Sequence, residues 1–254
     1  MSRALFIAAC GLGGLLTGVF VNVLILRGAG DRPFRPPWSR CGECDAAMPA
    51  AGLLPVFGTS AIGSTCPSCG APFGWWQPAV EVANGVLWIV AAVRFGAHLP
   101  VVPYLFLFSA LLALSVIDLF TYRLPDRITY PVLYVSVPLL VIISLVDHHP
   151  RHLLWAFIGA AGYYGLLALM WLISPKGMGY GDVKLGRILG LYLGWIHIVL
   201  PIYGLGIAGI LGSVIGIGVL LASRDRRRAF PFGPWLALGC VIAVAFSAQL
   251  TAGL

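Results

Sequence analysis

The sequence predicts an all-α polytopic membrane protein with about eight transmembrane helices, and its composition, segment lengths and charge placement all favour this class. The chain has 254 residues, of which 59% are hydrophobic and only 10% are charged. Its mean hydropathy is +0.94. A soluble globular domain has about 25% charged residues, so this chain lacks the charge for a surface that faces water on all sides. The same composition excludes a disordered chain, because disorder requires low hydrophobicity and high charge.

Eight hydrophobic segments account for most of the chain, and each is about as long as the roughly 20 residues that a transmembrane helix needs. The first segment is too long for the apolar core of a cleaved signal peptide, and Arg3 is the only basic residue before it, so we expect a retained helix. The glycines from Gly204 to Gly218 suit close helix packing in lipid. The segments cover residues 4–26, 78–97, 100–119, 128–146, 152–173, 182–200, 202–222 and 231–250.

The basic residues predict the orientation of these helices. Only Arg3, Arg94 and Arg151 of the 16 basic residues fall on one set of alternating connections. Basic residues are enriched in cytoplasmic loops, so we expect the other set in the cytoplasm and both termini outside. Eight of the nine acidic residues lie on or near that same side, Asp147 being the exception. The predicted cytoplasmic set is Arg27, Arg32, Arg35, Arg40, Arg123, Arg127, Lys176, Lys184, Arg187, Arg224, Arg226, Arg227 and Arg228.

Four cysteines occur as two C-x2-C pairs in the long polar connection between the first two helices. Cys41 and Cys44 form the first pair, and Cys66 and Cys69 form the second. Two such pairs can place four thiolates tetrahedrally around one ion, and this ligand set selects zinc, with iron as the less favoured occupant. We therefore predict a small cytoplasmic zinc-binding loop domain at residues 27–77, with a structural metal. A catalytic metal and thiol chemistry are the alternatives.

Two aspartates stand at the ends of apolar segments, where an ionisable side chain is costly and is by default a functional candidate. Asp118 follows the apolar run 111–117, and Asp182 follows a glycine-rich stretch at the start of the sixth segment. The alternative is that both are ordinary helix-end residues, with Asp182 as an N-cap. Together, a carboxylate pair can supply the general base and the general acid for peptide hydrolysis. Helix dipoles favour Asp182 as the resting base and Asp118 as the resting acid.

Around these residues the sequence resembles the type IV prepilin peptidases, which are polytopic GxGD aspartyl proteases. The resemblance covers most of the chain in order. It implies cleavage of the basic leader of prepilins or pseudopilins at the cytoplasmic face of the bacterial inner membrane. It also implies that Asp118 and Asp182 are the catalytic pair, and that Asp126 begins a helix after a turn. The matching motifs are GVFVNV at 18–23, PAVE at 78–81, DLFTYRLPD at 118–126, GMGYGDVKL at 177–185 and PFGP at 231–234.

The glycines and the lysine of the second aspartate motif are predicted to form a substrate-binding loop. Gly179 and Gly181 have no Cβ atoms, so an extended peptide can approach the backbone closely. Lys184 follows them and could contact lipid phosphate, the substrate or the aspartate pair. We accordingly expect three parts: a first helix at 1–26, the loop domain at 27–77 and a seven-helix aspartyl peptidase domain at 78–254.

Many members of the resembled family also methylate the new N-terminus with S-adenosylmethionine, an activity linked to the cysteine-bearing loop. The family usually has an acidic-Asn-Ile-Pro run between the cysteine pairs, whereas residues 50–58 of this chain read AAGLLPVFG. Glu81 is then the candidate methyltransferase acid. We expect prepilin substrates and membrane lipid as partners, and no nucleic acid.

Two other functions remain open at this point. One is a related GxGD peptidase for other membrane-anchored precursors, and the other is a proton- or ion-coupled transporter or a scaffold. Transporter sites usually lie near the membrane midplane, whereas both aspartates are predicted at cytoplasmic helix ends. Their position favours the peptidase.

Overall fold

The computed structural model describes residues 2–30, 40–48, 56, 65–72, 74–175, 178–223 and 231–252. Gly177 and most of the connection between the cysteine pairs lie outside this part of the chain. So do nine of the charged residues used to predict orientation: Asp31, Arg32, Arg35, Lys176, Arg224, Asp225, Arg226, Arg227 and Arg228.

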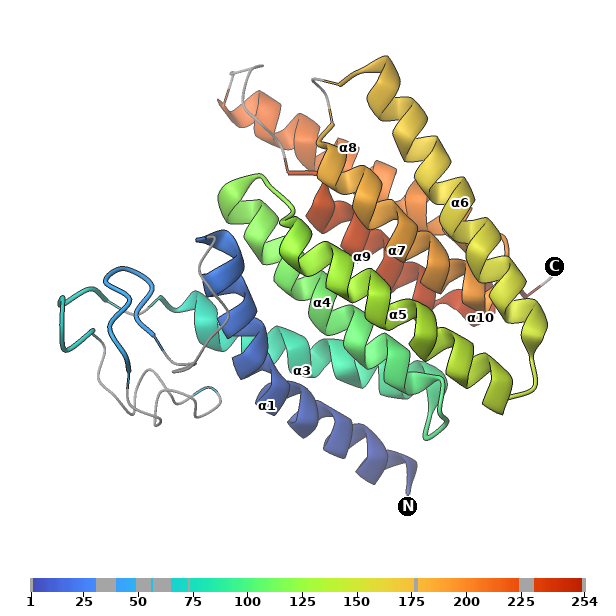
Figure 1. The fold of residues 1–254 in the computed structure, drawn as a ribbon, viewed down its shortest axis with the longest axis horizontal. Coiled ribbons are helices and arrows are strands. Elements are labelled where there is room, and N and C mark those ends of the chain that lie inside the picture. Colours follow the sequence, from blue (N-terminus) through green and yellow to red (C-terminus); the bar gives the residue numbers. More distant parts are fainter. Residues whose placement is uncertain are drawn as a thin grey trace. The chain divides into compact units, whose positions relative to one another are not determined.

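Each predicted hydrophobic segment corresponds to a helix (Figure 1). The last segment is divided at Phe246 into two helices. The helices in the described residues are α1 (Arg3–Ala29), α3 (Trp76–Phe95), α4 (Val101–Thr121), α5 (Asp126–Val146), α6 (Pro150–Ile173), α7 (Tyr180–Ile196), α8 (Leu200–Ser223), α9 (Gly233–Ala245) and α10 (Ser247–Leu250).

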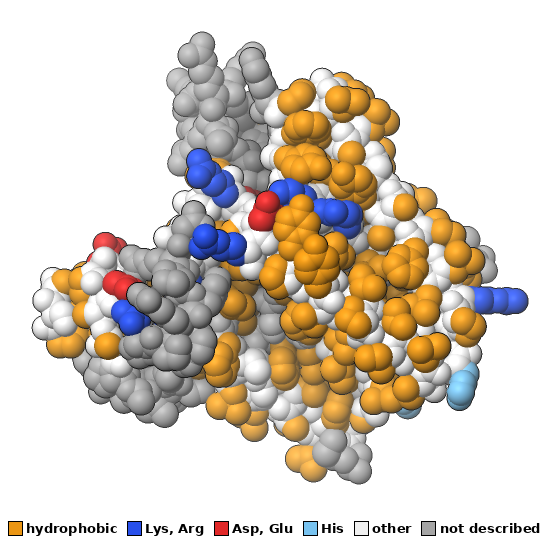
Figure 2. Space-filling view, in the orientation of Figure 1, with side chains coloured by type: hydrophobic (Ala, Val, Ile, Leu, Met, Phe, Trp, Pro, Cys, Tyr) orange, Lys and Arg blue, Asp and Glu red, His pale blue; other side chains and the backbone are white. Residues whose placement is uncertain are grey.

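Six of these helices are long and apolar enough to cross a membrane: α1, α3, α4, α5, α6 and α8. The remaining predicted spans are shorter, since α7 has 17 residues and α9 has 13. Large apolar side chains such as Phe20 and Ile202 are exposed on the long helices, and Figure 2 shows hydrophobic side chains over much of the helical surface. Lipid rather than water solvates such a surface. The prediction of an all-α, multi-pass membrane protein is confirmed.

The described chain divides into two compact units. The first comprises Met1–Val101 with Phe108–Ala113, and the second comprises Val102–Leu107 with Leu114–Leu254. The predicted three-part division at residues 26 and 77 stays a prediction.

In the first unit, small residues let α1 and α3 pack closely. A Cβ atom on Gly14 would lie 2.7 Å from the Cα atom of Gly85. The buried Asn84 bonds across this interface, because its Nδ2 donates to the carbonyl of Gly14 at 2.7 Å and to Thr17 Oγ1 at 3.0 Å. Its Oδ1 accepts from Ser109 Oγ at 2.8 Å. The interface therefore buries a polar side chain whose hydrogen bonds are satisfied.

In the second unit, α7 is the most enclosed helix. Its residues from Ile188 to Trp195 are all buried, and it packs against α5, α6, α8 and α9. The contact with α6 depends on glycine, because a Cβ atom on Gly159 would lie 2.5 Å from the carbonyl oxygen of Gly190. Asp182 in the first turn of α7 is buried, whereas Tyr180 in the same turn is exposed.

The late glycines differ in their surroundings. Side chains on Gly204 and Gly212 would clash with Leu193 and Phe232, whereas Gly206 faces no atom within 4 Å. Gly209 and Gly218 are equally open. Within the described chain, close packing is therefore confirmed at Gly204 and Gly212, whereas a Cβ atom on Gly206, Gly209 or Gly218 would have no neighbouring atom within 4 Å.

Candidate functional site

Asp118 lies in the last turn of α4, with 5% of its surface exposed. The buried side chains of Leu114 and Ile117 anchor the same turn. After the helix, Tyr122 adopts a positive φ of 53° and its backbone N–H donates to the carbonyl of Asp118 at 2.8 Å. A left-handed residue is a common way to end a helix. The helix therefore ends at Thr121, one turn after Asp118, which is buried near this end.

Asp182 lies in the first turn of α7 and is 6% exposed. The helix N-cap is Gly179, so the alternative in which Asp182 is an N-cap is wrong. The backbone N–H of Asp182 donates to the carbonyl of Gly179 at 3.1 Å. A Cβ atom on Gly181 would lie 2.9 Å from Cβ of Leu124, so a glycine is needed where this turn meets the segment before α5.

The two carboxylates approach a common point beside Gly233, the first residue of α9. The backbone N–H of Gly233 donates to Asp118 Oδ2 at 3.1 Å. A Cβ atom built on Gly233 would lie 2.8 Å from Asp118 Oδ2 and 3.5 Å from Asp182 Oδ1. Residues 118 and 182, which are far apart in the sequence, therefore direct oxygen atoms to one place. When two carboxylates share a partly dry site of this kind, one ionises more easily than the other.

A cavity of about 450 Å³ opens beside this pair. Its size lies in the range of ligand-binding clefts. All three predicted loop residues, Gly179, Gly181 and Lys184, line it. The other lining residues are Asp118, Tyr122, Arg123, Leu124, Pro175, Met178, Tyr180, Asp182, Pro231 and Phe232.

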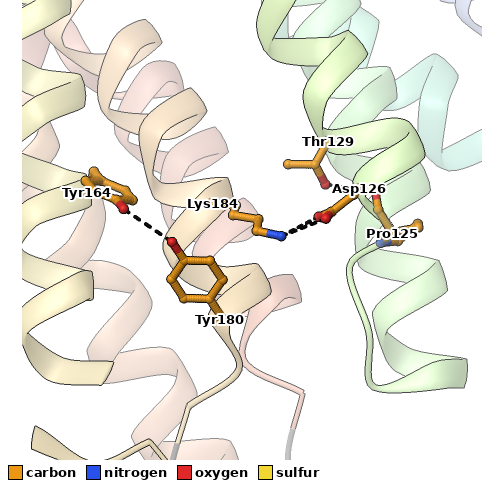
Figure 3. A network of polar contacts seen from close by, with 6 residues as sticks. All are labelled: Pro125, Asp126, Thr129, Tyr164, Tyr180 and Lys184. Carbon is orange, nitrogen blue, oxygen red and sulfur yellow. Dashed lines mark hydrogen bonds and ion pairs between the residues drawn. The ribbon is translucent and has the colours of Figure 1, made fainter. Parts of the chain in front are cut away.

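Lys184 forms an ion pair with Asp126 at the edge of this cavity (Figure 3). Its Nζ lies 2.6 Å from Asp126 Oδ1 and 2.8 Å from Oδ2. The lysine side chain is 15% exposed and the aspartate side chain 54%. The ring centroids of Tyr180 and Tyr130 lie 5.2 Å and 5.5 Å from Nζ, within range of a cation–π interaction. Asp126 begins α5, and this pair links the N-termini of α5 and α7.

Breaking the Lys184–Asp126 pair is expected to have a small effect on stability. Because Asp126 is largely exposed, solvent screening limits the pair to about 1 kcal/mol or less. Lys184→Met, Asp126→Asn and the double variant form a cycle that isolates this coupling in the free energy of unfolding in detergent. A coupling of several kcal/mol would contradict a solvent-screened pair.

The four cysteines of the first unit converge as predicted. Their sulfur atoms all lie within 4.8 Å of one another. Cys41 Sγ is 3.8 Å from Cys69 Sγ, and Cys44 Sγ is 3.9 Å from Cys66 Sγ. Two sulfur atoms that bind one zinc ion tetrahedrally at about 2.3 Å are about 3.8 Å apart. The cluster could therefore bind a metal ion.

The two cysteine pairs have the same backbone structure. The N–H of Cys41 donates to the carbonyl of Ala46 at 3.0 Å, and the N–H of Cys66 donates to that of Ala71 at 2.8 Å. Each turn also contains one residue with a positive φ, Asp45 at 59° and Gly70 at 71°. Two equivalent turns therefore present two thiols each, which is how a C-x2-C pair delivers ligands to one metal.

Electrostatics in the cluster favour a bound cation. The backbone N–H groups of Cys69 and Ser68 lower the pKa of Cys66 to about 6. The N–H of Ala71 acts in the same direction on Cys69, but hydrogen bonds with the other thiols and burial outweigh it and raise the pKa of Cys69 to about 12. One thiol thus ionises readily, whereas a further negative charge beside it is costly without a cation.

Glu81 and Asn22 form a buried polar contact between α3 and α1. Asn22 Nδ2 donates to Glu81 Oε1 at 2.9 Å and to the carbonyl of Gln77 at 3.0 Å. The backbone N–H of Val56, in the cysteine-bearing connection, donates to Glu81 Oε2. Glu81 is 7% exposed and Asn22 is 6% exposed. The structure thus joins the GVFVNV and PAVE motifs, a pairing that sequence reasoning did not predict.

Gly233 is the other residue of the site that sequence reasoning missed. The PFGP motif at 231–234 was noted, but nothing in its composition indicates that a backbone N–H of this segment reaches Asp118. The signal available in the sequence was a glycine followed by a proline at a predicted helix start.

Two family models together match most of the chain. Residues 105–220 match the Type IV leader peptidase family, and residues 12–95 match the Bacterial Peptidase A24 N-terminal domain. No solved structure matches the chain significantly.

Three relatives are each called "Prepilin leader peptidase/N-methyltransferase". The protein of Pseudomonas putida is 33% identical over 99% of this chain and 94% of its own length. The protein of Burkholderia pseudomallei is 36% identical over 83% of this chain and 67% of its own length. The protein of Pseudomonas aeruginosa is 31% identical over 97% of this chain and 92% of its own length. These matches show that the chain, with its helical membrane architecture and paired aspartates, belongs to the type IV leader peptidase family.

Proposed function

We propose that this chain is an integral-membrane aspartic endopeptidase that cleaves the basic leader of type IV prepilins or pseudopilins at the cytoplasmic face of the bacterial inner membrane. The observation that carries the proposal is the approach of the buried Asp118 and Asp182 carboxylates to one point beside a cavity. Membership of the family and the names of the relatives support the substrate class.

In the mechanism we propose, the aspartate pair shares one proton. The ionised carboxylate takes a proton from water as the water oxygen bonds to the scissile carbonyl carbon. The protonated carboxyl donates its proton to the departing amine as the C–N bond breaks, so the pair again holds one proton. Each aspartate lies at or beside the N-terminus of a helix. Asp182 is in the first turn of α7, and Asp118 accepts a hydrogen bond from the backbone N–H of Gly233, the first residue of α9. The assignment of Asp182 as the resting base stays a prediction.

The glycines of the cavity wall support binding of an extended peptide. Gly179 and Gly181 expose backbone without Cβ atoms, so hydrogen bonds to a substrate strand are sterically accessible there. In this proposal Lys184 holds the wall in place through Asp126 while lining the cavity.

We propose zinc as the ion of the four-cysteine cluster, with Cys41, Cys44, Cys66 and Cys69 as ligands. The sulfur separations and the all-thiolate donor set suit zinc. Four protein ligands complete a tetrahedral shell, so zinc would stabilise the fold of the cysteine-bearing connection and take no part in peptide cleavage.

We propose methylation of the new N-terminus as a second activity, with Glu81 as the candidate acid. S-adenosylmethionine would supply the methyl group. Glu81 already accepts two hydrogen bonds, but a carboxylate has about four acceptor sites, which leaves capacity for an ammonium group. Within the described residues, the neighbouring Asn22 Oδ1 is buried and accepts no hydrogen bond. The Glu81 carboxylate and Asn22 Oδ1 could therefore both accept hydrogen bonds from an amine. The relatives' names support the activity.

Co-expression with a candidate prepilin tests both activities. Mass spectrometry of the prepilin N-terminus is expected to show loss of the leader, and a further gain of one methyl group reports the second activity. Cells without the chain provide the control. An uncleaved prepilin beside a cleaved flagellin-like precursor would indicate the related peptidase instead. If neither precursor is cleaved, the peptidase proposal is wrong.

A further inference from the structure

The N-terminus of α9 is capped by a side chain from another helix. The first N–H groups of a helix have no acceptor within it. In α9 the N–H groups of Trp235 and Leu236 donate to the carbonyl of Phe232 at 3.1 Å and 3.2 Å, and Pro234 has no N–H. The N–H of Gly233 instead donates to Asp118 Oδ2 at 3.1 Å, in a buried hydrogen bond between residues 115 positions apart.

The absence of a Cβ atom at Gly233 matters as much for the position of the Asp118 carboxylate as the N–H of this residue does. A Cβ atom there would lie 2.8 Å from Asp118 Oδ2, 3.4 Å from Asp118 Cγ and 3.5 Å from Asp182 Oδ1. Contacts of a real Cβ atom below 3.0 Å are essentially never seen. Asp118 is buried on a helix, so its carboxylate could move away only by giving up the hydrogen bond to Gly233.

Packing against α8 holds Gly233 in this position. A Cβ atom on Gly212 of α8 would lie 2.9 Å from Phe232 Cε2, so the residue before Gly233 packs directly on α8. Farther along α9, a Cβ atom on Gly239 would lie 2.5 Å from the carbonyl oxygen of Gly204. Contacts just before α9 and in its middle therefore set the place of its N-terminus independently of Asp118.

We propose that Gly233 is a positioning residue for the aspartate pair. Its N–H fixes the orientation of the Asp118 carboxylate, and its lack of a side chain leaves room between the two carboxylates for the water that they activate. The inference deepens the proposed function and rests on it. A methyl group at this point would displace both the carboxylate and the water, whereas the peptide-binding cavity walls formed by α7 would be unchanged.

The first test is Gly233→Ala in the full-length protein, purified in detergent and assayed with a prepilin. We expect kcat to fall by roughly 100-fold, the scale of a misplacement of about 1 Å in a catalytic group, with KM changed by less than about threefold because the substrate contacts remain. Gly206→Ala is the matched control, because it makes the same change on α8 at an exposed position with no atom within 4 Å. It is expected to match the wild type.

A stability cycle tests the contact without relying on activity. We expect Gly233→Ala to lower the Tm of the wild type, and to lower it much less in an Asp118→Ala background, because the clash requires the carboxylate. An equal loss of Tm in both backgrounds would overturn the inference, and so would wild-type kcat in Gly233→Ala. Failure of the wild type and Gly206→Ala to cleave any prepilin would instead refute the proposed function, and the stability cycle would still decide the contact.

Discussion

Replacing Asp118 or Asp182 with asparagine is expected to lower the rate of prepilin cleavage by roughly 10³- to 10⁴-fold, because an amide can neither accept the proton of water nor return one to the leaving amine. The double variant should be little worse than either single variant, since the residues act as a unit. The measurement is the cleavage rate of purified protein in detergent, followed by the mass of the prepilin N-terminus.

Stability separates loss of chemistry from loss of fold in these variants. Asparagine has nearly the shape of aspartate, and each replacement leaves one carboxyl group where two approach a common point, so the cost of placing negative charge beside a second carboxyl is removed. We therefore expect Tm values no lower than that of the wild type. Asp147→Asn is the matched control, because this aspartate lies at the opposite end of α5 from Asp126 and does not line the cavity. Retained cleavage in Asp118→Asn or Asp182→Asn would contradict the catalytic pair.

Replacing Cys66 with serine is expected to reduce bound zinc from about one equivalent to near zero, because a hydroxyl is a poor substitute for a thiolate ligand and closed tetrahedral sites need all four donors. Structural zinc in small domains supplies folding energy directly, so the cysteine-bearing connection should become sensitive to limited proteolysis. Metal content by mass spectrometry and the cleavage pattern measure both effects.

Two other cysteines provide matched controls for the metal prediction. Cys10 and Cys240 are buried within α1 and α9 and lie outside the four-cysteine cluster. Cys10→Ala and Cys240→Ala should keep one equivalent of zinc. Full zinc content in Cys66→Ser, or equal loss in the control variants, would contradict the assigned ligands. Because the zinc shell is complete without substrate, we also expect cleavage by Cys66→Ser to persist in the fraction that remains folded.

Local sequence was enough to predict the helices and the candidate residues. Lipid requires each spanning segment to be a long apolar helix, so the six long helices follow from local composition, whereas α7 and α9 are shorter than a typical span. The four cysteines were also evident, because each C-x2-C turn depends on a few neighbouring residues. Asp118 and Asp182 stood out because charge is so scarce, at 10% of the chain.

Which of these residues meet depends on how the helices pack, and this could not be predicted from the sequence. The approach of Gly233 to Asp118 and the contact of Asn22 with Glu81 join residues far apart in the sequence. The same holds for glycine, since Gly159 packs against Gly190 while Gly206 is open. A helix presents different residues on each face. In a membrane protein the faces toward lipid and toward other helices are both apolar, so the hydrophobic pattern does not reveal which face meets which neighbour. Backbone-to-side-chain contacts such as that of Gly233 leave no compositional trace.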